Sequence, residues 1–395
     1  MKKVVLAFSG GLDTSYCGIY LSKEMGLEVH AAIANTGGFS KEELAKIEER
    51  ANGLGIKSFT CLDVTEKYYD ETIRFMVYGN MLKNATYPLS VSAERISQAT
   101  AIALYAKEIG ADYICHGSTG AGNDQVRFDM IFNILAPEIE VIALIREKRL
   151  SREEEIEYLR SYGVDFDFKK AEYSINQGIW GTSIGGKETL TSQTTLPEEA
   201  YPTKLTKEGS EELVLSFEEG KLVAVNGEKL GAIEAILKVQ EIAGAYAIGR
   251  DMHVGDTIIG IKGRVGFEAA APVVIIKAHH MLEKHTLTKW QLFWKDQISA
   301  FYGNHLHEGQ YYDPVMRDME AMLEKSQRYV TGDVILTLYP YRFMVVGVDT
   351  PHDLMSDEFG SYGEMNNSWT GEDVRGFGKI FGNQTSIHRN VNKGE

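Results

Sequence analysis

The chain has 395 residues, of which 44% are hydrophobic and 25% charged, and its net charge is −15 at pH 7. This length suffices for two domains with cores of their own, and the composition is typical of a soluble globular protein. The negative charge argues against a broad nucleic-acid-binding face, which needs clustered basic residues. No apolar run reaches the length of a membrane span, and a strand pattern begins directly after Met1-Lys2-Lys3, so we expect neither membrane association nor a signal peptide.

The three cysteines, Cys17, Cys61 and Cys115, lie in or beside apolar strand or helix patterns. They form no Cys-X-X-Cys motif and are odd in number, so we expect buried thiols rather than disulfides. This cysteine usage predicts a protein of the reducing cytoplasm.

In the first part of the chain, short β-rich runs alternate with helical periodicity. Such alternation predicts an α/β fold with a parallel sheet, and ligands then bind beyond the carboxyl ends of the strands. The loops that start near Ser9, Ala34 and His116 should therefore meet at one site. Ser151 and Glu154 form a capping-box pattern at the start of a helix. The strand patterns cover 4–8, 29–33, 58–62, 113–115 and 140–145, and the helical patterns cover 13–25, 41–54, 66–77, 92–109 and 151–162.

The pattern changes after about residue 165. Two strand patterns flank Glu-Glu-Gly-Lys at 218–221, which indicates a hairpin. Strands and helices no longer alternate strictly, so we expect an α+β second domain over 166–362 and a tail over 363–395. The strand patterns cover 214–217, 222–225, 257–261, 334–339 and 343–348, and the helical patterns cover 232–245, 274–287, 290–302 and 314–329.

The segment Ser9–Ser15, Ser-Gly-Gly-Leu-Asp-Thr-Ser, joins the first strand pattern to the first helical pattern. Its glycines let backbone N–H groups converge, and the helix N-terminus adds partial positive charge, so the loop suits a phosphate or pyrophosphate. The Gly-Lys-Ser/Thr ending of a Walker A loop is absent. Without that lysine, the loop favours a reaction at the α-phosphorus that releases pyrophosphate and leaves an adenylylated intermediate. A purely structural turn is the alternative.

A second glycine-rich stretch, Gly117–Gly122, has three glycines in six residues and allows the backbone to approach a ligand closely. After it, Asn123 offers both donors and an acceptor, Asp124 can pair with an ammonium group, and Arg127 can hold a carboxylate bidentately. Together these side chains fit an amino-acid substrate. The alternative is an ordinary loop with a helix N-cap at Asn123 or Asp124.

The first loop resembles the ATP loop of the N-type ATP pyrophosphatases, and the segment 116–128 is similar to the second signature of the argininosuccinate synthase family. A third match comprises Tyr173-Ser174, Trp180-Gly181 and Ser183. The resemblance covers most of the chain and is loose beyond residue 200. It implies a HUP/Rossmann-like nucleotide-binding domain over 1–165, a synthetase and oligomerisation domain over 166–362, and homotetramers in which the tail reaches across subunits.

Members of this family condense citrulline with aspartate in arginine biosynthesis, forming argininosuccinate, AMP and pyrophosphate from ATP through a citrullyl-adenylate. The resemblance implies ATP binding with Mg²⁺ carried by the triphosphate, and we assign no other metal. Asp124 and Arg127 are expected to act most directly in the reaction. The residues implied to bind ATP are Ala7, Phe8, Ser9, Gly10, Gly11, Leu12, Asp13, Thr14, Ser15, Ala34 and Gly117. Those implied to bind aspartate are Thr119, Asn123 and Asp124, and those implied to bind citrulline are Tyr87, Ser92, Asn123, Arg127, Ser174 and Ser183.

The sequence departs from the family pattern at three places. Where the family has Ala-Asp-Leu-Gly-Gln, residues 34–38 read Ala-Asn-Thr-Gly-Gly. Where it has Leu-Gly-Thr-Ser-Leu-Ala-Arg-Pro, residues 89–96 read Leu-Ser-Val-Ser-Ala-Glu-Arg-Ile. A glutamate and a tyrosine of the family's citrulline site correspond to Gly255 and Phe267.

Losing that glutamate removes an anionic partner for an ammonium group, at a cost of roughly 1.5–3 kcal/mol if the bond is buried. Either other residues replace it in a divergent citrulline site, or the substrate is an N-acylated citrulline such as the acetyl or succinyl derivative. A tRNA-thiolating pyrophosphatase is a further alternative, opposed by the net charge and the unpaired cysteines. A non-catalytic nucleotide sensor is another, opposed by the presence of a second-substrate loop.

Two remaining groups of residues suggest no chemistry. Four aromatic residues at helical spacing are interpreted as core or interface, and three histidines lack the partners of a metal site. The aromatic residues are Trp290, Phe293, Trp294 and Phe301, and the histidines are His279, His280 and His285.

Overall fold

The computed structural model describes residues 1–164, 173–356, 358, 360–364 and 368–394. The chain divides into two compact units, Met1–Pro351 and His352–Glu395. The second unit contains helices α13 (Gly371–Phe381) and α14 (Asn383–Val391).

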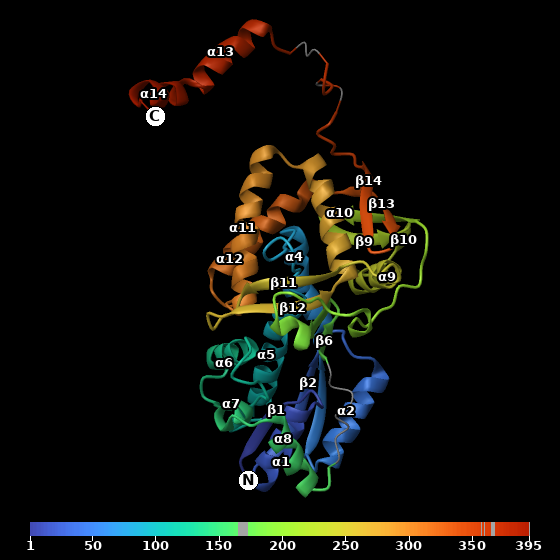
Figure 1. The fold of residues 1–395 in the computed structure, drawn as a ribbon, viewed down its shortest axis with the longest axis vertical. Coiled ribbons are helices and arrows are strands. Elements are labelled where there is room, and N and C mark those ends of the chain that lie inside the picture. Colours follow the sequence, from blue (N-terminus) through green and yellow to red (C-terminus); the bar gives the residue numbers. More distant parts are fainter. Residues whose placement is uncertain (165–172, 357, 359, 365–367, 395) are drawn as a thin grey trace. The chain divides into compact units, whose positions relative to one another are not determined.

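The N-terminal part of the first unit is a five-stranded parallel sheet of order β3-β2-β1-β4-β5. Helices lie on both sides of it (Figure 1), and the predicted α/β domain is confirmed. The strands are β1 (Lys3–Ala7), β2 (Glu28–Asn35), β3 (Ser58–Asp63), β4 (Tyr113–Cys115) and β5 (Glu140–Ile142). The helices are α1 (Leu12–Lys23), α2 (Lys41–Gly53), α3 (Thr65–Tyr68), a π turn (Tyr69–Ile73), α4 (Arg74–Tyr78), α5 (Ser90–Glu108), α6 (Asp124–Leu135), α7 (Leu144–Lys148) and α8 (Arg152–Ser161).

Strand β1 shows why this sheet is covered on both faces. Val4 and Leu6 pack into one core with Cys17 of α1, whereas Val5 packs into the other core with Ala103 of α5. Successive side chains of a strand point to opposite faces, so a continuous apolar run requires helices on both sides. Strand β1 pairs with β2 on one side and with β4 on the other. The order in which strands are added to the sheet therefore changes side at β1. Such a switch point leaves a crevice at the carboxyl ends of β1 and β4.

The remainder of the first unit contains two antiparallel sheets and long helices, in agreement with the predicted α+β part. One sheet has the order β10-β9-β8-β13-β14 and the other β11-β12-β7-β6. The strands are β6 (Ser174–Gly178), β7 (Gly181–Gly185), β8 (Glu211–Glu218), β9 (Lys221–Val225), β10 (Glu228–Lys229), β11 (Arg250–Asp256), β12 (Lys262–Glu268), β13 (Gly332–Tyr339) and β14 (Arg342–Asp349). The helices are α9 (Ala232–Gly244), α10 (Ala270–Thr286), α11 (Lys289–Glu308) and α12 (Val315–Ser326), with 3₁₀ turns at Lys187–Leu190, Glu198–Ala200 and Gln327–Tyr329.

Several local predictions can be compared with these elements. The capping box at Ser151 and the hairpin of β8 and β9 are confirmed. The strand predicted at 257–261 is wrong, because Gly260 has a positive φ and these residues form the turn between β11 and β12. Of the three cysteines, Cys17 and Cys115 are buried, but Cys61 is exposed, so that prediction is wrong for Cys61.

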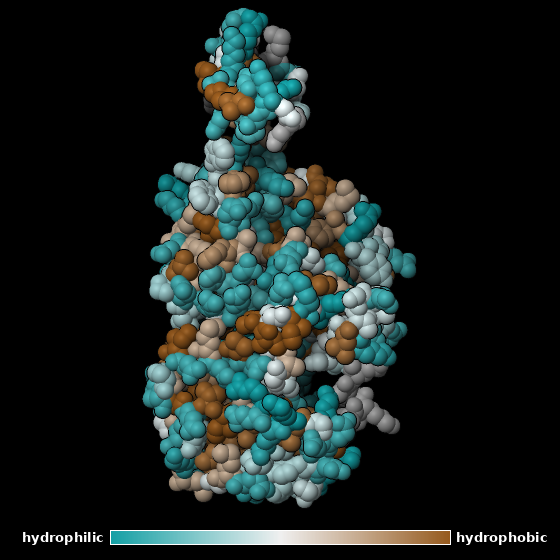
Figure 2. Space-filling view, turned by 60° about the vertical axis from the view of Figure 1, so that its left-hand side comes forward, coloured by the Kyte–Doolittle hydropathy of each residue, from teal (hydrophilic) through white to brown (hydrophobic). Residues whose placement is uncertain are grey.

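The aromatic side chains of α11 do not belong to the core. Trp290 and Trp294 are 65% and 60% exposed, so the core alternative is wrong for them, whereas the interface alternative stays a prediction. On the face that Figure 2 shows, the surface is mostly polar and the apolar side chains form separate groups. Among the described residues, none of the helices combines the length and apolar character needed to cross a bilayer.

Candidate active site at the carboxyl ends of β1 and β4

A cavity of about 1000 Å³ lies at the switch point of the parallel sheet. The loops after β1, β2 and β4 contribute to its wall, as the alternating sequence pattern predicts, and so do α5, α6 and strands β6, β7, β11 and β12. The cavity is therefore built by both the parallel sheet and the α+β part.

The first glycine-rich loop forms one side of this cavity. Gly10 has a φ of +73°, a conformation that favours glycine, and Gly11 occupies the N-cap position of α1 without any side-chain cap. The first N–H groups of the helix thus remain available to an anion. Of the residues implied to bind ATP, those that line the cavity are Ala7, Phe8, Ser9, Gly11, Leu12, Asp13, Thr14, Ala34 and Gly117.

Gly10 and Ser15 are not part of the cavity wall. The Ser15 side chain is fully buried, and its hydroxyl donates to the Gly11 carbonyl over 2.7 Å. The Ser15 hydroxyl thus shapes the loop, and its contact with ATP stays a prediction.

The second glycine-rich loop is held by His116. Its Nδ1 accepts the Ser118 backbone N–H over 3.2 Å, and its Nε2 lies 2.9 Å from Asp129 Oδ1. These two bonds require the proton on Nε2.

A Cβ atom on Gly117 would come within 3.0 Å of the Thr14 methyl group, so the two loops approach this closely because residue 117 has no side chain.

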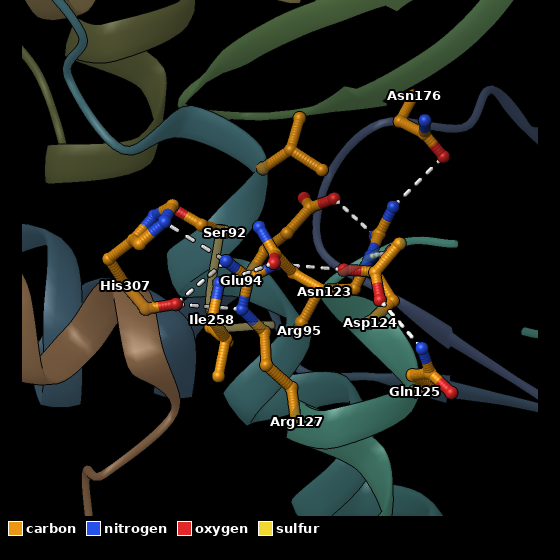
Figure 3. A network of polar contacts seen from close by, with 12 residues as sticks. Ser92, Glu94, Arg95, Asn123, Asp124, Gln125, Arg127, Asn176, Ile258 and His307 are labelled. Carbon is orange, nitrogen blue, oxygen red and sulfur yellow. Dashed lines mark hydrogen bonds and ion pairs between the residues drawn. The ribbon is translucent and has the colours of Figure 1, made fainter. Parts of the chain in front are cut away.

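A polar network crosses the cavity wall between α5 and α6 (Figure 3). Both carboxylate oxygens of Asp124 accept from arginines, Oδ2 from Arg95 Nε over 3.0 Å and Oδ1 from Arg127 Nη1 over 2.8 Å. Burial alone would raise the pKa of the Asp124 carboxyl, but the two guanidinium groups outweigh burial and lower it. Asp124 is therefore a fixed carboxylate, able to attract an ammonium group and poorly suited to accept a proton.

The expectation that Arg127 holds a substrate carboxylate bidentately is not met. Its Nε and Nη2 both donate to the His307 carbonyl oxygen, over 2.9 and 2.7 Å, and its Nη1 is used by Asp124. Arg127 is 4% exposed, so its planar fork joins α6 to α11 rather than facing a ligand with two free donors.

Asn123 occupies the N-cap position of α6, but its side chain does not cap the helix. Its Oδ1 accepts instead from the Ile258 N–H over 2.8 Å, in the turn between β11 and β12. The cap alternative is thus wrong for the Asn123 side chain, and the contact ties the second loop to the α+β part of the chain.

The residues implied to bind citrulline also reach the cavity. Tyr87 accepts the Val91 N–H on its hydroxyl over 3.1 Å, and its ring stacks on His253 with 5.1 Å between centroids. Ser92 lies inside α5, which begins at Ser90, so it is not the N-cap of that helix. All the predicted substrate residues line the cavity, namely Tyr87, Ser92, Thr119, Asn123, Asp124, Arg127, Ser174 and Ser183.

Sequence reasoning missed several side chains of this wall, among them Glu94, Arg95, Asn176, His253 and His307. Glu94 is 1% exposed and His253 is 5% exposed. Burial lowers the pKa of His253 to about 4, assisted by the charge of Lys83, so its imidazole is neutral. For Glu94 the sequence offers one signal, since a buried carboxylate must find a partner and Arg95 is its direct neighbour.

Comparison with known proteins gives the family. Residues 3–165 match the model of the arginosuccinate synthase N-terminal HUP domain, and residues 173–388 match that of the arginosuccinate synthase C-terminal domain. The chain belongs to the argininosuccinate synthase family. The relatives named argininosuccinate synthase include one from Methanocaldococcus jannaschii, 38% identical with 91% of each chain covered, and one from Dictyoglomus turgidum, 36% identical with 98% of this chain and 97% of the relative covered. Another is from Pyrococcus furiosus, 34% identical with 98% of this chain and 95% of the relative covered.

Gly255 and Phe267, the two positions singled out in the sequence, differ in their relation to the cavity. Gly255 and Gly263 pair across β11 and β12, and both line the wall. Phe267 is 1% exposed and pairs with Ser183 of β7, so its ring is core rather than wall. These two positions thus offer neither a carboxylate nor a phenolic hydroxyl.

Proposed function

We propose that this chain condenses citrulline with aspartate at the expense of ATP, forming argininosuccinate, AMP and pyrophosphate. One observation supports this most directly: a single cavity joins the uncapped N-terminus of α1 to the Asn123–Arg127 segment. A phosphate site and an amino-acid site that share one wall suit a two-substrate reaction driven by nucleotide cleavage. The names of the relatives support the same assignment.

In the first step, the ureido oxygen of citrulline attacks the α-phosphorus of ATP, and the bond to pyrophosphate breaks. The converging N–H groups at Gly11–Thr14 would hold the departing pyrophosphate, because fixed donors stabilise charge that develops during the reaction. Mg²⁺ carried by the triphosphate would neutralise part of that charge. The described residues contain no group of three His, Cys, Asp or Glu side chains that could hold a metal ion.

In the second step, the α-amine of aspartate attacks the ureido carbon, and AMP leaves with the electron pair of the carbon–oxygen bond. The ammonium group loses two of its three protons to the AMP phosphate or to water. Asp124 would orient the incoming ammonium group, and Thr119 and Asn123 would bind beside it. Asp124 is not the base, since Arg95 and Arg127 keep its pKa low against the effect of burial. Its role is therefore to hold and position the amine.

The assembly and location follow from the resemblance alone. We propose a cytoplasmic homotetramer in which the C-terminal unit contributes to subunit contacts. In support, α13 exposes Phe377 and Phe381, which are 63% and 77% accessible. Apolar side chains exposed together on one helix are typical of a surface that binds a partner.

A pyrophosphate-release assay with Mg-ATP and aspartate tests the function, with citrulline, acetylcitrulline and succinylcitrulline offered in parallel. We expect turnover with free citrulline, formation of argininosuccinate, and dependence on aspartate. Turnover of an acylated substrate without turnover of citrulline would contradict the substrate assignment. ATP binding without pyrophosphate release for any pair would support the nucleotide sensor instead.

A further inference from the structure

A buried carboxylate lies directly behind the arginine that holds Asp124. Glu94 of α5 is 1% exposed. Its Oε2 accepts from the Thr36 hydroxyl over 2.9 Å, and its Oε1 accepts from Arg95 Nη1 over 2.7 Å. A side chain on Gly178 would collide with this carboxylate, so β6 also adapts to its presence.

The two partners of this contact come from different parts of the parallel-sheet region, Thr36 from the loop after β2 and Glu94 from α5. Their side chains meet over 2.9 Å although the residues are separated by 58 positions in the chain. This hydrogen bond leaves neither polar group buried without a partner.

Arg95 transmits this contact to the candidate active site. Its Nη2 donates to Asn176 over 2.9 Å, its Nη1 to Gln98 and Glu94, and its Nε to Asp124. Figure 3 shows the guanidinium between Glu94, Asn176 and Asp124. Because every nitrogen of the guanidinium has a partner, its plane is fixed, and the direction of Nε toward Asp124 is fixed with it.

We propose that Glu94 is a positioning residue for the aspartate half of the reaction. It fixes Arg95 by accepting a hydrogen bond from its Nη1. Arg95 in turn holds the Asp124 carboxylate where the amine of the second substrate binds. The hydrogen bonds of Glu94 go to Thr36 and Arg95, and not to the first glycine-rich loop or the residues implied to bind citrulline, so it serves the second step more than the first. This inference rests on the proposed function.

The two half-reactions separate this role from a general loss of structure. Citrulline-dependent exchange of pyrophosphate into ATP needs no aspartate, whereas argininosuccinate formation does. For Glu94→Gln, which keeps the volume and removes the charge, we expect kcat/KM for aspartate to fall about tenfold or more, as for loss of a buried charged hydrogen bond. The exchange rate without aspartate should change by less than about twofold, because Arg127 and the loops keep their contacts.

Thr36→Val provides a second variant that removes only the hydroxyl, and it should shift the aspartate dependence in the same direction by a smaller factor. Glu320→Gln is the matched control. Glu320 is also buried and accepts from a hydroxyl, that of Tyr302 over 2.7 Å, and from Arg317, but it lies outside the cavity wall. It should leave the ratio of the two half-reactions unchanged.

The unmodified enzyme must first show both reactions, and their absence would refute the proposed function rather than the role of Glu94. Equal loss of exchange and turnover in Glu94→Gln, or no change in either, would overturn the positioning role. A crystal structure of the variant gives a test that is independent of activity. We expect Arg95 to leave hydrogen-bond distance of Asp124, and an unchanged contact would overturn the proposal.

Discussion

Gly255 lies directly beside the imidazole of His253, and a Cβ atom on Gly255 would come within 2.6 Å of His253 Nε2. His253 cannot easily give way, because its ring stacks on Tyr87 at 5.1 Å. Real Cβ atoms do not approach other atoms so closely, so the shape of this part of the cavity depends on the absence of a side chain at residue 255.

Gly255→Ala should therefore move His253 and, with it, Tyr87. We expect kcat/KM for citrulline to fall about tenfold, since overpacking of this kind costs on the order of 1–3 kcal/mol. The KM for ATP should stay unchanged, because the glycine-rich loop lies elsewhere on the wall. Steady-state kinetics with each substrate varied in turn measures this. Val254→Ala is the control, because Val254 is 51% exposed. An unaltered dependence of the rate on citrulline in Gly255→Ala would refute the prediction.

A second close approach joins the loop after β2 to β6. A Cβ atom on Gly38 would come within 2.6 Å of the Gln177 carbonyl carbon, which is backbone and cannot rotate away. Gly38→Ala should therefore separate these segments and lower the free energy of unfolding by about 1–3 kcal/mol. Urea denaturation measures the change.

Gly53 offers the matched control, since a Cβ atom there meets no atom within 4 Å. It lies at the end of α2, where alanine should be neutral or slightly stabilising. If Gly38→Ala were as stable as Gly53→Ala, the close approach to β6 would not restrict residue 38.

The parallel sheet and its two loops could be predicted from sequence because each signal is local. Val4-Val5-Leu6 is apolar at every position, which indicates a strand covered on both faces, and both cores confirm it. The loop after β1 is recognisable because strand, glycine turn and helix follow one another within Val4–Ser15.

The contacts that complete the candidate site could not be predicted in the same way. Asn123 meets Ile258 across 135 positions, and Arg127 meets His307 across 180. Such contacts depend on how the α+β part packs against the parallel sheet, which no local pattern encodes. Residue type suggested that Arg127 binds a ligand, but burial and the His307 carbonyl decide what its guanidinium actually does.

One further pair of carboxyl groups joins two helices, Asp13 of α1 and Glu155 of α8. Burial, together with repulsion by and hydrogen bonding to the neighbouring Asp13 carboxyl, raises the pKa of Glu155 to about 8. Glu155 is 2% exposed, and its Oε2 has no hydrogen-bond partner. The fold thus favours the protonated form of this carboxyl.

This shift predicts how stability depends on pH. In the unfolded chain Glu155 titrates near its ordinary value of 4.5, so between there and about 8 the folded state binds more protons than the unfolded state. The stability that the raised pKa of Glu155 contributes is complete below the pKa of this group in the unfolded chain. It is lost as the pH rises toward the pKa of the group in the folded protein. Glu155→Gln, which stays neutral, should therefore raise the midpoint of thermal unfolding at pH 8.5 and have little effect at pH 4.5. Glu153→Gln, at an exposed position of the same helix, is the control. An equal shift of the Glu155→Gln midpoint at both pH values would show that the effect is not electrostatic.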